Sequence, residues 1–363
     1  EVAMSERLLR QFMEMVQIDS ESGNEARFLD YLLEEVSAVG GTAALDDYGN
    51  LIAMFEAVDC EGVEPILLSC HGDTVKPGVG IEPVLEEGII RSKGDTILGA
   101  DDKAGIAEVL EALRVAPVRP PIEFAVSRQE EVGLLGVKAM DFSRLTARRG
   151  FLMDNDTLYT IVIGGPTYFA IDVAVAGRAA HAGMEPEKGI NAIRAAAKGI
   201  ASLRLGRIDH ETTANVGVIS GGIIRNGVPD SCSFLAECRS ADHDKAVALS
   251  DEMTWILRRE IEGVGATVEI QVDEMCRAVQ IPEDAWSVRI AKEALATVDI
   301  DAEAVFMTGF TDASIYNNRG IEMAVVGIGA QNEHSTEECI EVADMEKAVK
   351  MLVEIFRLVA NEG

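Results

Sequence analysis

Short apolar runs alternate with an amphipathic repeat in the first part of this chain, and this order restricts the fold more than any other feature. Strand-like runs stand at 51–55, 65–70, 121–127 and 150–154, and a helical repeat stands at 102–115. Strands that alternate with helices are typical of a mostly parallel sheet flanked by helices. The sequence therefore predicts an α/β fold for this region.

The order of the runs changes at about residue 166. From there to residue 277 it reads strand, helix, strand, strand, helix, strand, and this βαββαβ order makes a compact α+β unit by itself. After residue 278 the α/β pattern returns, and it ends in a helix after residue 342. We expect a main domain of residues 1–165 and 278–363, with an inserted α+β lid domain at 166–277.

Two helix starts are also predicted near the N-terminus. Ser5 is expected to cap a first helix, and SGNE at 22–25 has the Ser-x-x-Glu form of a capping box before a second helical repeat.

Composition limits the partners and the compartment. The formal net charge of -30 argues against a nucleic-acid ligand, because phosphates would be repelled. No apolar run approaches the length of a membrane span, and the N-terminal EVAMSERLLRQF lacks the apolar core of a signal peptide. The six cysteines form no CxxC pair, which is typical of free thiols in a reducing compartment. We expect a cytoplasmic protein with no membrane partner.

Polar clusters follow the ends of the predicted strands, which is where functional groups of open α/β sheets gather. They are HGD at 71–73, GADDKAG at 99–105, SRQEEVGLLG at 127–136, Asp154 and His334. Each cluster alone has an ordinary explanation: a hydrogen-bonded strand-end histidine, a solvated acidic loop, or an aspartate in a turn. Their repetition at the strand ends of one sheet favours a shared site.

Imidazoles and carboxylates together are the ligand set of a borderline metal such as zinc. A carboxylate can bridge two ions, and Asp101 is the candidate for that role. Two ions that share Asp101 need about two further ligands each, and His71, Glu131, Asp154 and His334 make that number. We therefore expect two divalent metal ions, with zinc as the expected metal, although manganese and cobalt suit the same ligands.

Two more carboxylates are expected to act beside the ligands. On an extended backbone Asp73 points the same way as His71, so it is expected to accept the second ring N–H of that histidine. Glu130 points away from its neighbour Glu131 and is expected to face a water activated by the metals. There it would act first as general base and then as general acid.

Taken together, these blocks resemble the co-catalytic zinc exopeptidases, the family that includes peptidase T, carboxypeptidase G and succinyl-diaminopimelate desuccinylase. The resemblance covers the whole chain, including the lid, and rests on several blocks in the right order. It distributes five ligands between two ions that share one aspartate: His71, Asp101 and Asp154 for the first, and Asp101, Glu131 and His334 for the second. It also implies a cis peptide bond between Asp101 and Asp102.

The resemblance implies roles for lid residues as well. His181 matches a family histidine that reaches the active site of the partner subunit and stabilises the oxyanion, which implies a homodimer formed through the lid. Asn226 and Arg239 match lid positions that contact substrate. Arg225 is a candidate clamp for a substrate carboxylate, because guanidinium and carboxylate pair in bidentate fashion.

The implied reaction is removal of the N-terminal residue from short peptides. In the family, deacylases and carboxypeptidases tend to have Glu where this chain has Asp154, and members that act on free amino ends tend to have Asp. The loop GFTDAS at 309–314 resembles peptidase T, but Phe310 and Ala313 depart from its Gly-Gly-Thr-Asp-Gly form, which leaves a strict tripeptide preference open. Two alternatives also remain: an N-acyl amino acid deacylase or carboxypeptidase of the same family, and a metal-binding scaffold without activity.

Overall fold

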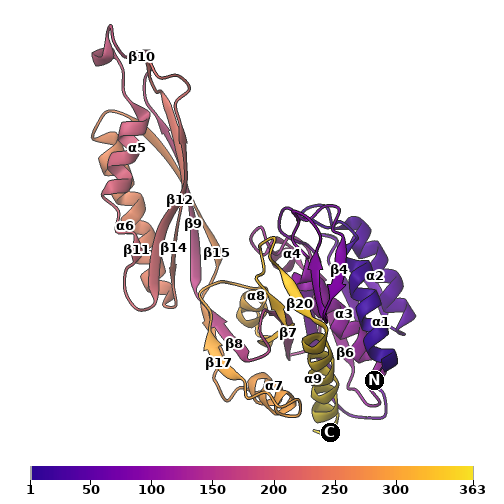
Figure 1. The fold of residues 1–363 in the computed structure, drawn as a ribbon. Helices are drawn as coiled ribbons and strands as arrows, with labels where there is room; N and C mark the ends of the chain where they lie inside the picture. The colour runs from indigo at the N-terminus through magenta and orange to yellow at the C-terminus, as the bar shows by residue number, and fades with distance from the viewer. Residues whose placement is uncertain (1, 363) are drawn as a thin grey trace. The chain divides into compact units, whose positions relative to one another are not determined.

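The computed structural model describes residues 2–362, which separate into two compact units (Figure 1). The main unit contains the residues up to Gly164 and those from Gln280 onward, and the lid is Gly165–Val279. Each unit has a buried apolar cluster of its own. The predicted insertion spanned 166–277.

A nine-stranded sheet, counted over the described residues, forms the centre of the main unit. Its strands run in the order β1 (Thr42–Leu45), β2 (Leu51–Phe55), β6 (Ile122–Ser127), β3 (Ile66–His71), β7 (Arg149–Asn155), β18 (Glu322–Gly327), β8 (Thr160–Gly165) and β16 (Val279–Gln280), with β17 (Glu303–Phe306) paired to β8. The central strands β6, β3, β7 and β18 are parallel, whereas β1 and β2 at one margin and β8 beside β18 are antiparallel. The predicted α/β class is confirmed.

Helices cover both faces of this sheet. They are α1 (Val2–Val16), α2 (Ala26–Ala38), α3 (Ala100–Val115), α4 (Leu135–Ala139), α7 (Trp286–Ala296), α8 (Ala313–Asn318) and α9 (Val342–Ala360), with a short 3-10 turn η1 (Phe142–Arg144). Leu68 and Cys70 of β3 belong to the same apolar cluster as residues of α1, α3 and α9. Ser69 between them lies 3.1 Å from the hydroxyl of Tyr316 in α8. Because side chains alternate along a strand, α8 covers the opposite face.

A small antiparallel sheet carries one of the predicted site residues. Its strands run in the order β19 (Ala330–Gln331), β20 (Cys339–Glu341), β5 (Ile89–Ser92) and β4 (Pro83–Glu86). Because β19 and β20 pair antiparallel, residues 332–338 form a hairpin loop, and His334 lies within it. The loop is therefore held at both of its ends.

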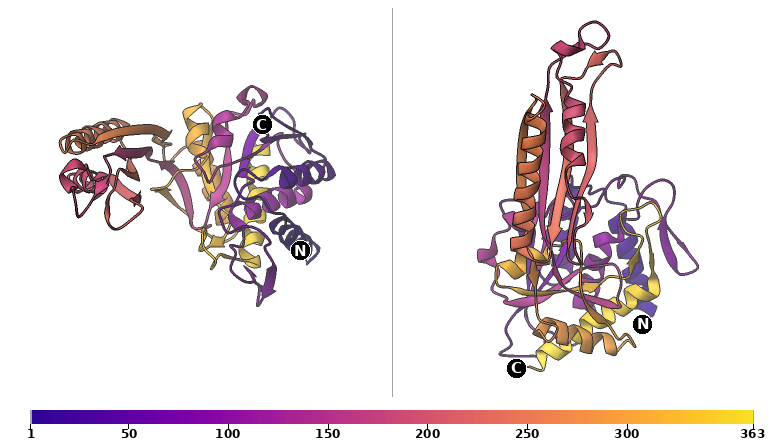
Figure 2. Two further views of the ribbon diagram at one scale, coloured as in Figure 1. Left: turned by 90° about the horizontal axis from the view of Figure 1, so that it is seen from above. Right: turned by 90° about the vertical axis from the view of Figure 1, so that its left-hand side faces the viewer.

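The lid is a five-stranded antiparallel sheet with two helices on one face (Figure 2). The strands run in the order β11 (Gly206–Arg207), β12 (Thr212–Gly221), β14 (Ser231–Ser240), β9 (Thr167–Ala176) and β15 (Thr267–Cys276), and the helices are α5 (Ala192–Ala201) and α6 (His243–Glu262). Along β9 the residues Ile171, Val173 and Val175 are buried, while those between them are partly or fully exposed. The long elements follow the βαββαβ order that the sequence predicts.

A short ribbon extends the lid beyond β9. It consists of β10 (Ala180–His181) paired with β13 (Gly227–Val228), and a 3-10 turn η2 (Pro186–Lys188) lies beside it. The ribbon brings the segments around His181 and Asn226 together, because His181 is the register partner of Gly227.

The N-terminal helix starts differ from the prediction. Helix α1 already includes Val2, so Ser5 is not its cap. Helix α2 starts at Ala26, but the expected capping box is absent at 22–25: Ser22 donates to Asp73, and Glu25 accepts from Arg128. Tertiary partners have replaced the local ones.

Two further expectations concern the whole described range. Between residues 2 and 362 no helix is both long and apolar enough to cross a membrane. All six cysteines are free, as predicted.

Candidate metal centre and its surroundings

The parallel strands place the predicted ligands at one edge of the central sheet. His71 is the last residue of β3 and lies opposite Ser127, the last residue of β6, so the loop that carries Glu131 starts beside it. Asp154 is near the end of β7, which pairs with β3 on the other side. Asp101 lies at the start of α3.

Asp101 stands between the two imidazoles. One of its carboxylate oxygens, Oδ1, lies 2.9 Å from Nε2 of His71, which is also 3.5 Å from Oδ1 of Asp154. The other, Oδ2, lies 3.1 Å from Nε2 of His334, which is also 2.9 Å from Oε1 of Glu131. The five residues therefore form two groups that share one carboxylate.

This geometry fits two cations. Each imidazole Nε2 faces two carboxylate oxygens, and one N–H cannot point at both. Ligand atoms that each lie about 2.0–2.2 Å from one ion are separated by about 3.3–3.6 Å in a tetrahedral site. The four observed separations run from 2.9 to 3.5 Å, so the His71–Asp154 pair has this spacing and the other three pairs lie closer together.

The protonation of His71 is set by the main chain. Its Nδ1 lies 3.0 Å from the carbonyl oxygen of Asp73 and 3.5 Å from the carboxylate of the same residue. A carbonyl oxygen only accepts, so the neutral ring carries its hydrogen on Nδ1 and keeps a lone pair on Nε2 for a metal. The nearest acceptor is therefore the backbone carbonyl of Asp73, whereas the sequence led us to expect its carboxylate.

The carboxylate of Asp73 holds the neighbouring loop instead. Its Oδ1 accepts the backbone N–H of Glu130 at 2.9 Å, and its Oδ2 accepts that of Glu131 at 3.2 Å. Oδ2 also accepts the hydroxyl of Ser22 at 2.6 Å. Asp73 therefore fixes the backbone of the candidate base and of a candidate ligand together.

Crowded negative charge shifts several pKa values in this centre. Burial raises the pKa of Glu130 well above its usual range, and the charge of Asp154 raises it further. Burial likewise raises the pKa of Asp154 to about 7. Contacts with Asp101 and Glu131 raise the pKa of His334 to about 11. The carboxylates outnumber the cationic side chains near them, which is the electrostatic setting that divalent ions relieve.

Glu130 has the environment of a proton acceptor. It is buried, with 7% of its surface exposed, and it follows the strand β6 that ends beside His71. A carboxylate with a raised pKa binds a proton more readily near neutral pH, which suits general base and general acid work.

Four further carboxylates near the site are buried, and the sequence prediction gave them no role as ligands or in catalysis: Glu25, Asp102, Asp312 and Glu338. Asp102 accepts the backbone N–H of His71 at 3.0 Å, and its bond to Asp101 is cis, as the resemblance implied. Asp312 accepts the hydroxyl of Ser127, and burial raises its pKa to about 7.

Glu25 organises the loop before the candidate base. Its Oε2 accepts two guanidinium N–H groups of Arg128, at 3.0 and 2.7 Å, and its Oε1 accepts the backbone N–H of Gln129 at 3.2 Å. These contacts cross more than a hundred residues of sequence, so no local pattern announced them. For Asp102 and Asp312, by contrast, the motifs GADDKAG and GFTDAS were an available signal.

His181 in the lid is poised to donate a hydrogen bond. Its Nδ1 accepts the backbone N–H of Gly183 at 3.2 Å and of Met184 at 3.1 Å. The neutral ring therefore carries its hydrogen on Nε2, and the side chain is exposed. Asn226 and Arg225 are exposed on the same ribbon, where the carbonyl of Asn226 accepts from Ala182 at 3.0 Å.

Arg239 lies at the other end of the lid sheet. It pairs with Glu237 at 2.8 Å and stacks on the ring of Tyr168, 4.4 Å from its centroid. Strand β14 runs from Ser231, next to the ribbon, to Arg239, and eight residues of strand span roughly 26 Å. Within one chain the lid does not bring Arg239 together with His181.

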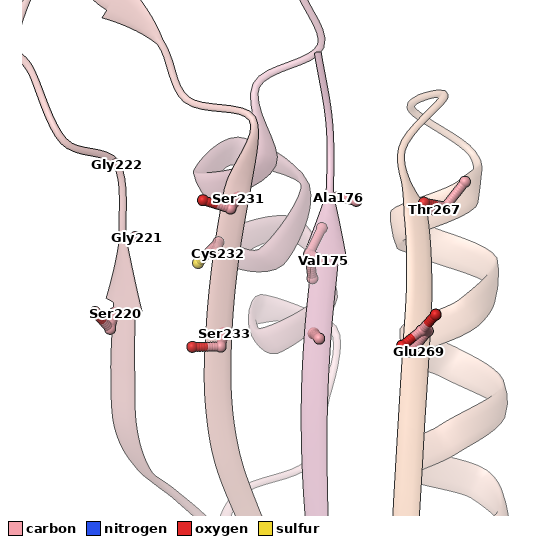
Figure 3. A pocket seen from close by; sticks show the side chains of 11 residues that line it. Val175, Ala176, Ser220, Gly221, Gly222, Ser231, Cys232, Ser233, Thr267 and Glu269 are labelled. Carbon is pink, nitrogen blue, oxygen red and sulfur yellow. The ribbon is translucent and has the colours of Figure 1, made fainter. Parts of the chain in front are cut away.

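A shallow cavity of about 460 Å³ lies on the lid, and none of the candidate ligands lines it (Figure 3). Small side chains such as Ser220, Ser231 and Ser233 line it, and Glu269 is its one carboxylate. Its lining has no imidazole and no second acid, so it does not bring together the imidazole and carboxylate ligands of a metal centre.

Comparisons with known proteins agree with this geometry. Residues 167–264 match the model of the peptidase dimerisation domain of the M20 family. The uncharacterized protein YqjE of Bacillus subtilis (strain 168) is 36% identical over 98% of this chain and 99% of its own length.

Two solved structures are similar over nearly their whole length. The aminopeptidase PepT from Bacillus cereus ATCC 10987 is 37% identical, with a TM-score of 0.88. A tripeptidase from Staphylococcus aureus subsp. aureus Mu50 is 33% identical, with a TM-score of 0.92. Each alignment covers 98% of this chain and 99% of the other.

Proposed function

The chain belongs to the M20 family of metallopeptidases, and on that premise we propose that it is a two-metal aminopeptidase that removes the N-terminal residue from short peptides. One observation carries this proposal: the two carboxylate oxygens of Asp101 face different imidazoles, His71 and His334. Asp154 would complete the first metal position and Glu131 the second. Zinc suits this mixture of nitrogen and oxygen ligands.

The residues of the main unit supply positioning and proton transfer. Divalent ions held by these residues would supply Lewis-acid chemistry, which polarises a scissile carbonyl and lowers the pKa of a water. Glu130 takes the proton of the attacking water and later gives it to the leaving amine. Asp73 keeps Glu130 and Glu131 in place by accepting both of their backbone N–H groups.

The lid supplies an oxyanion donor and substrate contacts. The Nε2–H of His181 is free of the backbone contacts that occupy Nδ1, so it is available for the tetrahedral oxyanion. Asn226 and Arg225 on the same ribbon would contact the peptide, and Arg239 would do so from the opposite end of the sheet. Because these two ends are far apart in one lid, one complete site would draw on two chains.

A homodimer formed through the lid would meet that requirement. Strand β11 pairs only with Thr213 and Ala214, so from Asn215 to Gly221 the outer edge of β12 has no strand partner within residues 2–362. Val218 and Ile219 on this stretch are 55% and 54% exposed. A free, apolar edge strand is a surface on which a second sheet can pair.

Asp154 and the named relatives support action on free amino ends. The similar structures are described as an aminopeptidase and a tripeptidase, so tripeptides are the expected substrates. Phe310 lies in the loop before α8, and Ala313 is the first residue of that helix. Because both depart from the peptidase T motif, the first question is whether the enzyme prefers tripeptides alone.

The central experiment combines metal analysis with a peptide panel. The purified protein should contain about two divalent ions per chain, and a chelator should abolish hydrolysis until zinc, manganese or cobalt is restored. Free-amino tripeptides should be cleaved, and N-acetylated ones should not. Turnover of N-acyl amino acids with no cleavage of free peptides would instead support the deacylase alternative.

The role of Glu130 is tested separately. In metal-loaded Glu130→Ala, kcat should fall by about 10²–10⁴-fold, because metal assistance remains while proton transfer is lost. Metal content should stay unchanged, and the exposed Glu61→Ala serves as the control. Full activity in Glu130→Ala would refute the mechanism.

A further inference from the structure

Glu338 makes an unusual set of contacts at the start of α3. Its side chain is buried, with 2% of the residue exposed. Oε2 accepts the backbone N–H of Leu98 at 2.8 Å and of Gly99 at 2.7 Å, and Oε1 accepts that of Ala100 at 2.8 Å and of Asp101 at 3.1 Å. One carboxylate therefore receives four consecutive backbone donors.

The position of these donors links Glu338 to the shared carboxylate. The last of the four N–H groups belongs to Asp101 itself, the residue that faces both imidazoles. Here the backbone is not yet helical, since Asp101 has φ −76° and ψ 107°. The N–H groups of Ala100 and Asp101 at the start of α3 have no partner within the helix, and Glu338 accepts both.

The other end of the link is the hairpin loop 332–338. Glu338 closes this loop four residues after His334, and its own N–H donates to the carbonyl of Ser335 at 3.2 Å. His334 has a left-handed backbone, with φ +60°, so the loop conformation that aims its ring is one that needs support. Glu338 joins the two segments whose side chains meet at 3.1 Å, between His334 Nε2 and Asp101 Oδ2.

We propose that Glu338 is a positioning residue of the metal centre, which fixes the segment of Asp101 against the loop of His334. The inference rests on the proposed two-metal function. Loss of Glu338 should therefore weaken metal binding and change the geometry of the Asp101 carboxylate. Residues that orient ligands in this way are worth about 10–100-fold in metal affinity.

The test substitution is Glu338→Gln, which keeps the shape of the side chain. An amide has one accepting oxygen, and its NH2 group would face backbone donors, so the four-donor arrangement cannot persist. The matched control is Glu337→Gln, the same chemical change at the exposed neighbouring glutamate. Both proteins are freed of metal and titrated with Zn²⁺ by calorimetry, and Co²⁺ spectra report ligand geometry.

The expected result is Zn²⁺ binding about 10–100-fold weaker in Glu338→Gln, with an altered Co²⁺ spectrum and no change in Glu337→Gln. Thermal unfolding of the metal-free proteins separates positioning from folding. Lower stability with unchanged affinity and spectrum overturns the proposal and leaves a purely structural role. Wild-type protein that takes up no Zn²⁺ refutes the proposed function itself, which is a different outcome.

A second variant, Glu338→Asp, keeps the proposal testable if Glu338→Gln does not fold. Glu338→Asp keeps the charge but withdraws the oxygens by one methylene, so it should fold and bind Zn²⁺ with an affinity between those of wild type and Glu338→Gln. Wild-type affinity in Glu338→Asp, where Glu338→Gln does not fold, overturns the proposal.

Discussion

Buried carboxylates in the main unit differ in whether their oxygens accept hydrogen bonds. Those of Asp73, Glu25 and Glu338 accept several N–H groups and so hold backbone in place. One oxygen of Asp312 and both oxygens of Glu108 have no hydrogen-bond partner in the described part of the chain. The first kind builds the site, whereas the second leaves charge unsatisfied and raises a pKa. Sequence alone cannot separate them, because the donors are main-chain atoms from distant segments.

Asp73→Asn tests the first kind. An Asn side chain offers one accepting oxygen, so it cannot hold the N–H groups of both Glu130 and Glu131. We expect kcat/KM for a tripeptide to fall by about 10–100-fold. The exposed Asp47→Asn is the control. Unchanged kinetics in Asp73→Asn would show that the loop holds its position without this carboxylate.

Glu108→Gln tests the second kind through pH. Glu108 is fully buried in α3, and burial, with Asp102 and Asp344 nearby, raises its pKa well above the usual range. The folded state then binds a proton that the unfolded state releases near pH 4.5. This contribution to stability is therefore present at low pH and is lost as the pH rises toward the folded pKa.

Glu108→Gln does not lose stability in this way as the pH rises, because the side chain at position 108 then carries no charge. The Tm of the variant minus that of wild type, both in chelator, should increase from pH 5 to pH 8. In a chain of 363 residues, each kcal/mol should appear as about 1–2 °C. A difference that is constant over this range would contradict the raised pKa.

At the scale of elements, most of the fold follows from local patterns. The apolar runs that end at His71 and Asp154 became β3 and β7, and neighbouring parallel strands must end at the same edge. That rule is why the sequence could assemble a ligand set from distant segments. The local sequence pattern was wrong for the capping box at 22–25. There Glu25 binds Arg128, which is distant in sequence, instead of capping its own helix.

The close pairing of β3 and β7 has its own requirement at Gly150. A Cβ at Gly150 would lie 1.9 Å from the carbonyl oxygen of Leu67, and a backbone atom cannot move aside cheaply. Gly150→Ala should therefore destabilise the protein by about 1–3 kcal/mol or more, measured by urea denaturation. In the same unit, Gly309→Ala would meet only the flexible end of Met307 at 3.2 Å, so it should cost little. Equal midpoints for the two variants would contradict this account of the strand contact.

At the scale of the whole molecule, the lid separates groups that one active site would need. His181 lies on the ribbon at one end of the sheet and Arg239 at the other. If the site is shared between two chains, Glu130→Ala and His181→Ala damage different partners of each site. A hybrid dimer then keeps one intact site, because the chain that lacks His181 still has Glu130 and receives His181 from its partner.

This arrangement predicts rescue by mixing two inactive variants. Random exchange makes half of the dimers hybrids, and each hybrid has one intact site of two, so about one quarter of wild-type activity per chain should return. Differently tagged chains verify the exchange. The control mixes Glu130→Ala with Asp101→Ala, which both damage the main unit, so no hybrid site is complete and no activity should return. If the His181→Ala mixture also stays inactive while hybrids form, each site is built within a single chain, and the free edge of β12 has no catalytic consequence.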